Sequence, residues 1–182
     1  MDAAAINTER LVLEPLGLKF LSQDYVNWLN DPIVNAFIVS RESGEEYTIE
    51  ALEDYLSDVE KKNILFWAIS LKGTGKHIGN IKIDPVSPKH GTGDYGILMG
   101  DRNEWNKGYA REASEAVIQY CFNELGIRKI TLAVAVENEA AVALYKKIGF
   151  IEEGLHRHHH KISDGVYSDC LRMAIFNPSF KY

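Results

Sequence analysis

The sequence is short of cysteine, of long apolar runs and of positive charge, and each shortage excludes a class of protein. Its two cysteines, Cys121 and Cys170, lie far apart in apolar surroundings, which excludes a disulfide framework or a zinc knuckle. Its longest apolar runs, ILFWAIS and ITLAVAV, are too short to cross a bilayer. Its net charge of −6 argues against a protein that binds nucleic acid through the phosphates. We therefore expect two buried, reduced thiols, no membrane partner and no nucleic-acid partner.

The remaining composition is that of an ordinary globular protein, with 46% hydrophobic and 25% charged residues. A length of 182 residues suits one domain, which we expect to span residues 1–182. The first ten residues, MDAAAINTER, contain no apolar stretch long enough for a signal peptide. We expect a soluble, cytoplasmic protein.

The spacing of apolar residues predicts a sheet covered by helices. Alternating or continuous apolar stretches indicate strands, and i, i+3, i+4 spacing indicates helices. We expect strands over 10–16, 64–71, 77–84, 94–100 and 129–136, a final hairpin around 163–165, and helices over 22–32, 48–62, 109–125 and 138–148. This order predicts an α/β fold with a mixed (α+β) sheet and helices on both faces.

The stretch EWNKGYAREA (104–113) predicts an anion-binding site, because it leads from a strand into a helix through Gly108. The first N–H groups of a helix have no intrahelical acceptor, and the helix dipole adds partial positive charge there. A glycine lets the backbone approach a ligand closely. The other phosphate-loop candidate, GTGKHIG (73–79), has Ser70 where a P-loop needs its first glycine, so it indicates a hairpin turn. The alternative for 104–113 is a plain helix start with a glycine hinge.

Together with NEAAVALYKKIGF (138–150), this stretch resembles the Gcn5-related N-acetyltransferase (GNAT) superfamily. More narrowly, it is similar to the branch that contains the ribosomal-protein N-terminal acetyltransferases. The superfamily's phosphate loop has the form [QR]-x-x-G-x-[GA], and the segment 105–110 matches its last three positions, with Trp105 in place of Gln or Arg. The resemblance implies a GNAT-like fold, with a mostly antiparallel twisted sheet, and acetyl-CoA as the co-substrate.

The resemblance also implies which residues contact acetyl-CoA. The pyrophosphate lies on backbone N–H groups of the loop, and the pantetheine arm pairs with the strand that precedes it. The implied contacts are Leu98, Met99 and Gly100 on that strand, and Trp105, Asn106, Lys107, Gly108, Tyr109 and Ala110 in the loop.

Asn138 and Tyr145 are seven residues apart, which places them on one face of a helix. In the family resembled, the matching asparagine bonds the pantetheine arm, and the matching tyrosine lies beside the sulfur as the general acid. The residues alone leave two alternatives open, an N-cap for Asn138 and a core aromatic for Tyr145.

For the general base, the resemblance implies Asp94 at the start of a strand, often acting through a water. Asp101 and Glu104 are alternatives nearer the phosphate loop. A surface carboxylate with no catalytic role is the alternative for each of the three.

The resemblance implies an acetyl-CoA-dependent N-acetyltransferase in which a small-molecule or peptide amine attacks the thioester directly. A peptide or protein α-amine is favoured, because neutralising it at pH 7 costs about 1–1.5 kcal/mol, against about 4–5 kcal/mol for a lysine side chain. The alternatives are an amino sugar or nucleotide-linked amino sugar as acceptor, and a non-catalytic acyl-CoA-binding module. Homodimers are common in this branch, and the sequence leaves the oligomeric state open.

The run HRHHH (156–160) raises the question of a metal site. On an extended strand His156, His158 and His160 face one way and His159 the other. No cysteine or carboxylate nearby completes a ligand set, so we expect no metal. Because this strand borders the acceptor pocket in the family resembled, we expect the histidines to contribute polarity there, with segment 28–32 lining the same pocket.

Overall fold

The computed structural model describes residues 3–37, 46–62, 64–163 and 165–181. Its strands form one eight-stranded sheet in the order β1-β2-β3-β4-β5-β6-β8-β7. Among the described strands, β5 and β6 are parallel and every other neighbouring pair is antiparallel. The strands are β1 (Ile6–Asn7), β2 (Leu11–Pro15), β3 (Leu65–Leu71), β4 (His77–Ser87), β5 (Thr92–Met99), β6 (Lys129–Ala135), β7 (Ile151–Ser163) and β8 (Val166–Phe176). The helices are η1 (Leu18–Phe20), α1 (Gln23–Asn30), α2 (Ile49–Lys62), η2 (Arg102–Glu104), α3 (Tyr109–Asn123) and α4 (Glu139–Ile148).

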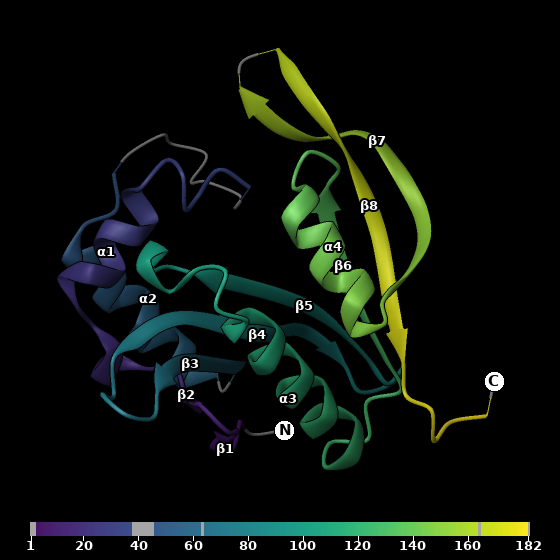
Figure 1. Cartoon of the computed structure of the whole chain (residues 1–182), viewed down its shortest axis with the longest axis horizontal. Coiled ribbons are helices and arrows are strands. Elements are labelled where there is room, and N and C mark those ends of the chain that lie inside the picture. Colours follow the sequence, from purple (N-terminus) through teal and green to yellow (C-terminus); the bar gives the residue numbers. More distant parts are fainter. Residues whose placement is uncertain (1–2, 38–45, 63, 164, 182) are drawn as a thin grey trace.

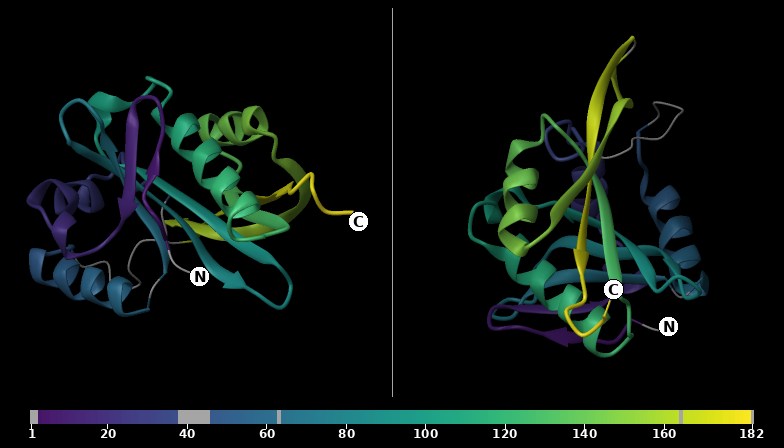
Figure 2. Two further views of the ribbon diagram at one scale, coloured as in Figure 1. Left: turned by 90° about the horizontal axis from the view of Figure 1, so that it is seen from below. Right: turned by 90° about the vertical axis from the view of Figure 1, so that its right-hand side faces the viewer.

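The helices cover both faces of the sheet, which confirms the predicted fold class. In the right-hand view of Figure 2, α2 lies on one side of the sheet and α3 and α4 lie on the other. Adjacent residues of β3 point to opposite faces: Trp67 belongs to the core under α3, and Phe66 and Ala68 belong to the core under α1 and α2. Since both faces are buried, the strand is apolar throughout. None of the described helices is long and apolar enough to cross a membrane.

The helix ends are capped by residues next to them in the sequence. Ser22 Oγ accepts from the Tyr25 N–H at the start of α1, and Thr48 Oγ1 accepts from the Ala51 N–H at the start of α2, both at 3.2 Å. Gly149 ends α4 with φ of 110°, a left-handed conformation that favours glycine. Cys121 and Cys170 are buried free thiols, as predicted.

Two parts of the sheet differ from the predicted elements. The strand pair β1–β2 begins at Ile6, earlier than expected, because a two-residue strand carries too little periodicity to be recognised. The strands expected over 77–84 and 94–100 leave 85–93 unassigned, but β4 and β5 continue into it, with Val86 opposite Gly93 beyond a register shift. Backbone hydrogen bonding across this hairpin outweighs the loop-like composition of the segment.

The feature that opens the sheet is a fork between β5 and β6, the point beyond which these strands no longer pair. They are hydrogen-bonded only from Thr92 opposite Lys129 to Asp94 opposite Thr131. Beyond the fork β5 follows β4 and β6 follows β8, so the two diverge, as Figure 1 shows. The β6-facing edge of β5 is therefore left without a strand partner over its last residues.

Candidate functional site

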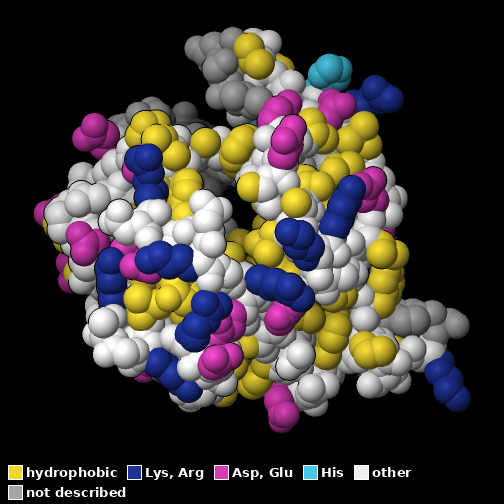
Figure 3. Space-filling model, viewed as in Figure 1, with side chains coloured by type: hydrophobic (Ala, Val, Ile, Leu, Met, Phe, Trp, Pro, Cys, Tyr) yellow, Lys and Arg dark blue, Asp and Glu magenta, His cyan; other side chains and the backbone are white. Residues whose placement is uncertain are grey.

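A cavity of about 1010 Å³, here called the fork cavity, lies beyond the fork, and Figure 3 shows this face of the molecule hollowed there. It is bounded by the end of β5, the loop before α3, the first turn of α3, one face of α4, and the segment after α1. Most of the predicted contacts line it: Leu98, Met99, Trp105, Asn106, Gly108, Tyr109, Ala110, Asn138 and Tyr145. Gly100 and Lys107 do not line it, and of the three candidate bases Glu104 lines it while Asp94 and Asp101 do not.

The loop before α3 turns through two left-handed residues. Asn106 has φ of 61° and Gly108 has φ of 84°. The first backbone bond of α3 runs from the Glu112 N–H to the Gly108 oxygen at 3.1 Å, and no side chain caps the helix. The N–H groups of residues 109–111 therefore have no intrahelical acceptor, and they lie at the positive end of the helix dipole. This local structure can bind a phosphate.

An ion pair that joins distant parts of the chain holds this loop in place. Arg10 donates from Nη1 to the Lys107 oxygen at 2.9 Å and from Nε to Glu112 Oε2 at 2.7 Å. Its guanidinium lies 4.6 Å from the centre of the Tyr109 ring. Burial alone would raise the pKa of Glu112, but hydrogen bonds from Thr8 and Arg10 lower it below its usual value. Sequence reasoning missed Arg10 and Glu112, because 102 residues separate them.

Trp105 and Gly100 have structural roles at the end of β5. The Trp105 indole Nε1 donates to the Met99 oxygen at 2.8 Å, which fixes the loop against the strand. A Cβ added to Gly100 would come within 2.0 Å of the Trp28 ring. Gly100 is therefore required by Trp28, which fills the space that we expected a ligand to approach.

Asn138, the N-cap of α4, and Tyr145 within that helix both line the fork cavity, so they share one side of the helix as predicted. Asn138 caps α4, its Oδ1 accepting from the Ala141 N–H at 3.2 Å. Its Nδ2 makes no hydrogen bond to another described residue and is available to a ligand. The N-cap and ligand roles are compatible.

Tyr145 packs its ring against Tyr95 and Phe150, with ring centres 5.6 Å and 5.8 Å away. The residue is 8% exposed, and its hydroxyl makes no hydrogen bond with any other described residue. Burial raises the pKa of Tyr145 to about 12, because the phenolate is poorly solvated there. The phenol is thus protonated at neutral pH and can donate its proton into the cavity.

The three candidate bases occupy different environments. Glu104 lies 2.8 Å from Lys107 Nζ and 3.6 Å from Lys76 Nζ, and Asp101 also pairs with Lys76. Burial would raise the pKa of Asp101, but its bonds to Lys76 and to the Asn103 N–H lower it overall. Each of these two carboxylates is therefore already paired with an ammonium group.

Asp94 lies at the fork itself and carries no such close ion pair. Its Oδ1 accepts from Thr131 Oγ1 at 3.1 Å, and Arg172 Nη2 is 3.9 Å away. Its side chain is 39% exposed. Because Asp94 does not line the fork cavity, a catalytic role for it requires an intervening water.

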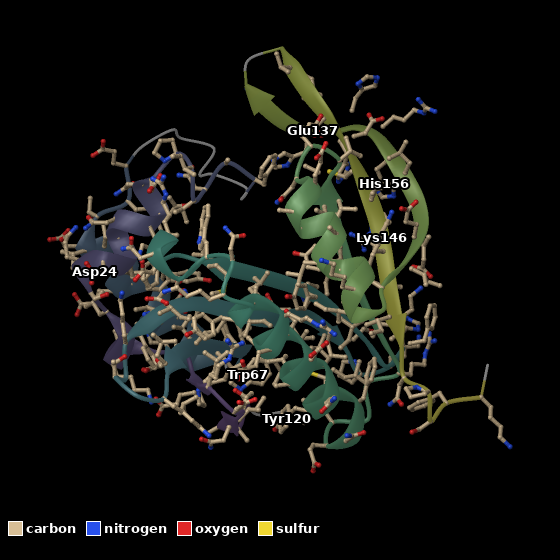
Figure 4. The ribbon with its side chains drawn as sticks, in the orientation of Figure 1. Asp24, Trp67, Tyr120, Glu137, Lys146 and His156 are labelled. Atoms are coloured by element: carbon tan, nitrogen blue, oxygen red, sulfur yellow. The ribbon has the colours of Figure 1, made fainter. Side chains whose placement is uncertain are left out.

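Two cations line the fork cavity that the sequence prediction did not include, Arg111 and Lys147. The adjacent Lys146 faces the other way, toward β7, with its Nζ 2.8 Å from Glu152 Oε1 (Figure 4). Helical spacing from Asn138 selects Lys146 (i+8) and not Lys147, whereas Lys147 follows Ala143 and Leu144, which also line the cavity, at i+4 and i+3.

The predicted alternation of the histidines is wrong. A register shift in the pairing of β7 with β8, between His156 and His160, includes His158 at φ of 49°. This conformation brings the rings of His156 and His159 to 5.0 Å from each other. In the part of the chain that the structure describes, no three His, Cys, Asp or Glu side chains are grouped to hold a metal. His156 lies on β7, on the far side of α4 from β5 in Figure 4.

Comparison with known proteins agrees with this geometry. The family described as "Acetyltransferase (GNAT) domain" matches residues 10–151. The chain belongs to this family. It is therefore an N-acetyltransferase of GNAT type with acetyl-CoA as its acetyl donor, as predicted, and the narrower ribosomal-protein branch stays a prediction.

Three relatives illustrate the range of the family. Uncharacterized N-acetyltransferase YoaA of Bacillus subtilis is 26% identical over 152 residues, which cover 84% of this chain and 85% of YoaA. L-amino acid N-acetyltransferase AaaT of Escherichia coli is 34% identical over 103 residues, covering 55% of this chain and 62% of AaaT. The structure of spermidine N-acetyltransferase from Vibrio cholerae, in complex with CoA and spermine, has a TM-score of 0.81 and 27% identity, covering 93% of this chain and 97% of that chain.

The residues around the fork cavity fit acetyl-CoA. Unpaired N–H groups at the start of α3, with Arg111 and Lys147 nearby, suit a pyrophosphate. The free edge of β5 offers backbone groups to an extended amide chain such as pantetheine. The volume of about 1010 Å³ is that of a site for a large ligand.

Proposed function

We propose that this chain transfers the acetyl group of acetyl-CoA to a primary amine by direct attack, with an α-amine as the favoured acceptor. The observation that carries the proposal is Tyr145, a buried phenol with a free hydroxyl in the same cavity as the unpaired N–H groups of α3. Acetyl-CoA supplies the acetyl group as an activated thioester. The chain's own residues bind it, orient it and move the protons.

The binding residues have separate tasks. The N–H groups of residues 109–111 hold the pyrophosphate, and the Asn138 Nδ2 and the backbone of Leu98 and Met99 hold the pantetheine amides. Tyr145 gives its proton to the departing sulfur, because the pKa of the phenol keeps that proton available throughout the neutral range. Asp94, through a water, takes the proton that the amine loses.

The preference for an α-amine depends on proton free energies. Deprotonating a lysine-type amine at pH 7 costs about 3 kcal/mol more free energy than deprotonating a peptide α-amine. The one base that we propose acts through a water, which favours an acceptor that needs little assistance. The named relatives act on different amines, a polyamine and L-amino acids, so the acceptor depends on residues particular to each chain.

The test is release of free CoA thiol from acetyl-CoA with a panel of amines at pH 7.5. The panel contains a lysine-free peptide, Nα-acetyl-lysine, glucosamine and spermidine. We expect the peptide α-amine to have a higher kcat/KM than the ε-amine. Preference for Nα-acetyl-lysine or spermidine would refute the α-amine proposal, and preference for glucosamine would favour the amino-sugar alternative. Binding of acetyl-CoA without turnover on any amine would indicate a non-catalytic module.

A further inference from the structure

A second cavity, of about 550 Å³, lies on the face of the sheet covered by α1 and α2. We call it the tyrosine cavity, because Tyr25, Tyr47 and Tyr55 form much of its wall. It shares Ile97 and Leu98 with the fork cavity, so the two cavities meet across β5. An acceptor bound in the tyrosine cavity would therefore lie next to the acetyl-donor site.

Asn80, on β4, lines the tyrosine cavity and carries an unpaired donor. The residue is 1% exposed. His77 Nε2 lies 3.0 Å from the Gly79 oxygen and 2.9 Å from Asn80 Oδ1. The carbonyl can only accept, so Nε2 bears the hydrogen and Asn80 Oδ1 accepts it as well. This leaves the Asn80 Nδ2, like the His77 Nδ1, as a buried atom with no partner among the described residues, on a side chain that lines the cavity.

Lys82, two residues further along β4, is the charged side chain of this cavity. Its stem crosses Gly96, where an added Cβ would lie 3.5 Å from Lys82 Cε. Its ionic partner is Asp84 at 3.9 Å, the outer limit of an ion pair, so the ammonium keeps donors for a ligand. Among the described residues that line the tyrosine cavity, none is an aspartate or a glutamate. A polyamine would meet the like charge of Lys82 there, and Asp84, the carboxylate near that ammonium, does not line the cavity.

We infer that the acceptor is an α-amino acid with an apolar or aromatic side chain. Its carboxylate binds Lys82 Nζ and the Asn80 Nδ2, its side chain packs among the tyrosines, and its amine points to β5. The inference depends on the proposed function and names the substrate class of that site. In the transfer the amine nitrogen bonds the acetyl carbon, the carbon–sulfur bond breaks, the amine loses one proton and the sulfur gains one.

The pairing with Lys82 also assists the chemistry. A free carboxylate stabilises the ammonium form of the amine beside it. When the Lys82 ammonium pairs with the acceptor's carboxylate, it cancels much of this stabilisation. The pKa of the acceptor amine is therefore lowered. Lys82 therefore contributes to both specificity and the supply of neutral amine.

The experiment compares three acceptors that differ at one group: L-phenylalanine, L-phenylalaninamide and 2-phenylethylamine. We expect Lys82→Gln and Asn80→Asp each to lower kcat/KM for phenylalanine about tenfold or more. In Lys82→Gln, kcat/KM for 2-phenylethylamine should change less than threefold. Asn80→Asp keeps the oxygen that accepts from His77, replaces the free donor by an acceptor oxygen and adds a negative charge, and both changes oppose a bound carboxylate. Lys82→Glu should raise the ratio of 2-phenylethylamine to phenylalanine. Lys89→Gln, an exposed turn lysine outside the cavity, is the control and should leave all three unchanged.

A second measurement does not need turnover or a neutral amine. The product N-acetyl-L-phenylalanine is titrated calorimetrically into the protein with CoA present, and its Kd should rise about tenfold in Lys82→Gln but not in Lys89→Gln. If Lys82→Gln still acetylates amines and its ratio of kcat/KM for phenylalanine to that for 2-phenylethylamine is unchanged, the inference is overturned and the proposed function stays intact. Turnover of no amine would refute the proposed function. In that case Lys82-dependent binding of N-acetyl-L-phenylalanine supports the tyrosine cavity as a carboxylate site, and the absence of such binding refutes that too.

Discussion

Replacing Tyr145 by phenylalanine removes the proposed proton donor and little else. The ring keeps its contacts with Tyr95 and Phe150. The hydroxyl makes no hydrogen bond with a described residue, so its loss should change the free energy of unfolding by less than about 0.5 kcal/mol. General acid catalysis typically contributes about 10²–10⁴-fold, so we expect kcat to fall at least about 100-fold, or about 2.7 kcal/mol in activation free energy.

The assay is initial-rate thiol release at saturating acetyl-CoA, with acceptor varied, from pH 6 to 10. Burial raises the folded-state pKa of Tyr145, so its proton is retained until the pH approaches about 12. In the wild type, kcat/KM should therefore rise as the acceptor amine becomes neutral and should not fall again before pH 10. The Tyr145→Phe variant should keep the rise of kcat/KM with pH and the KM for acetyl-CoA, but its kcat should be lower.

Tyr95→Phe is the matched control. The Tyr95 hydroxyl is 2.6 Å from Ser114 Oγ, which itself donates to the Ala110 oxygen, so Tyr95 is the donor of that bond. Removing it should cost about 1 kcal/mol of stability and change kcat less than threefold. A Tyr145→Phe enzyme with kcat within threefold of the wild type would refute the general-acid role, and an equal fall in both variants would show that only packing is affected.

Two further predictions concern the loop at the start of α3. Gly108→Ala and Gly75→Ala each place a side chain at a positive φ, 84° and 69° respectively, and each variant should lose about 1 kcal/mol of stability. Only Gly108→Ala should also raise the KM for acetyl-CoA, by at least tenfold. An equal KM in the two variants would contradict the phosphate site. Glu112→Gln should lose about 2 kcal/mol at pH 7 in urea unfolding, since Glu112 is bonded to the N-terminal segment. Because these bonds lower the folded-state pKa, the stabilisation is fully present above the unfolded pKa of about 4.3 and is lost as the pH falls through the lower folded pKa, so the difference should shrink below about pH 4.3 and vanish below the folded pKa. Glu115→Gln, in an exposed ion pair with Arg111, should change stability by less than about 0.5 kcal/mol at either pH.

Local sequence patterns predicted much of the fold and part of the fork cavity. Ser22, Thr48 and Asn138 cap the helices that follow them, because a cap depends on residues within one turn. Asn138 and Tyr145 line one cavity for the same kind of reason, since the helical repeat fixes which face they share. The family resemblance added the identity of the donor, which no local pattern could supply.

Contacts between distant segments could not be predicted in this way. The Arg10–Glu112 pair depends on how the first strands pack against α3, and the fork depends on where β5 stops pairing with β6. The bulge at His158 arises from the register of β7 against β8, so strict alternation gave the wrong faces for the histidines. The tyrosine cavity likewise brings together side chains of α1, α2 and the central strands.

The sequence by itself determined the four α-helices, most of the strands along the chain and the helix face that carries Asn138 and Tyr145. These depend on interactions between residues close in the chain, whose geometry is set by the helix and strand repeats. Only the tertiary structure decided that β5 separates from β6, that Trp28 fills the space over Gly100, and that the free donor of Asn80 and the ammonium of Lys82 meet in one cavity. Those outcomes depend on register and packing between segments far apart in sequence, which local patterns do not encode.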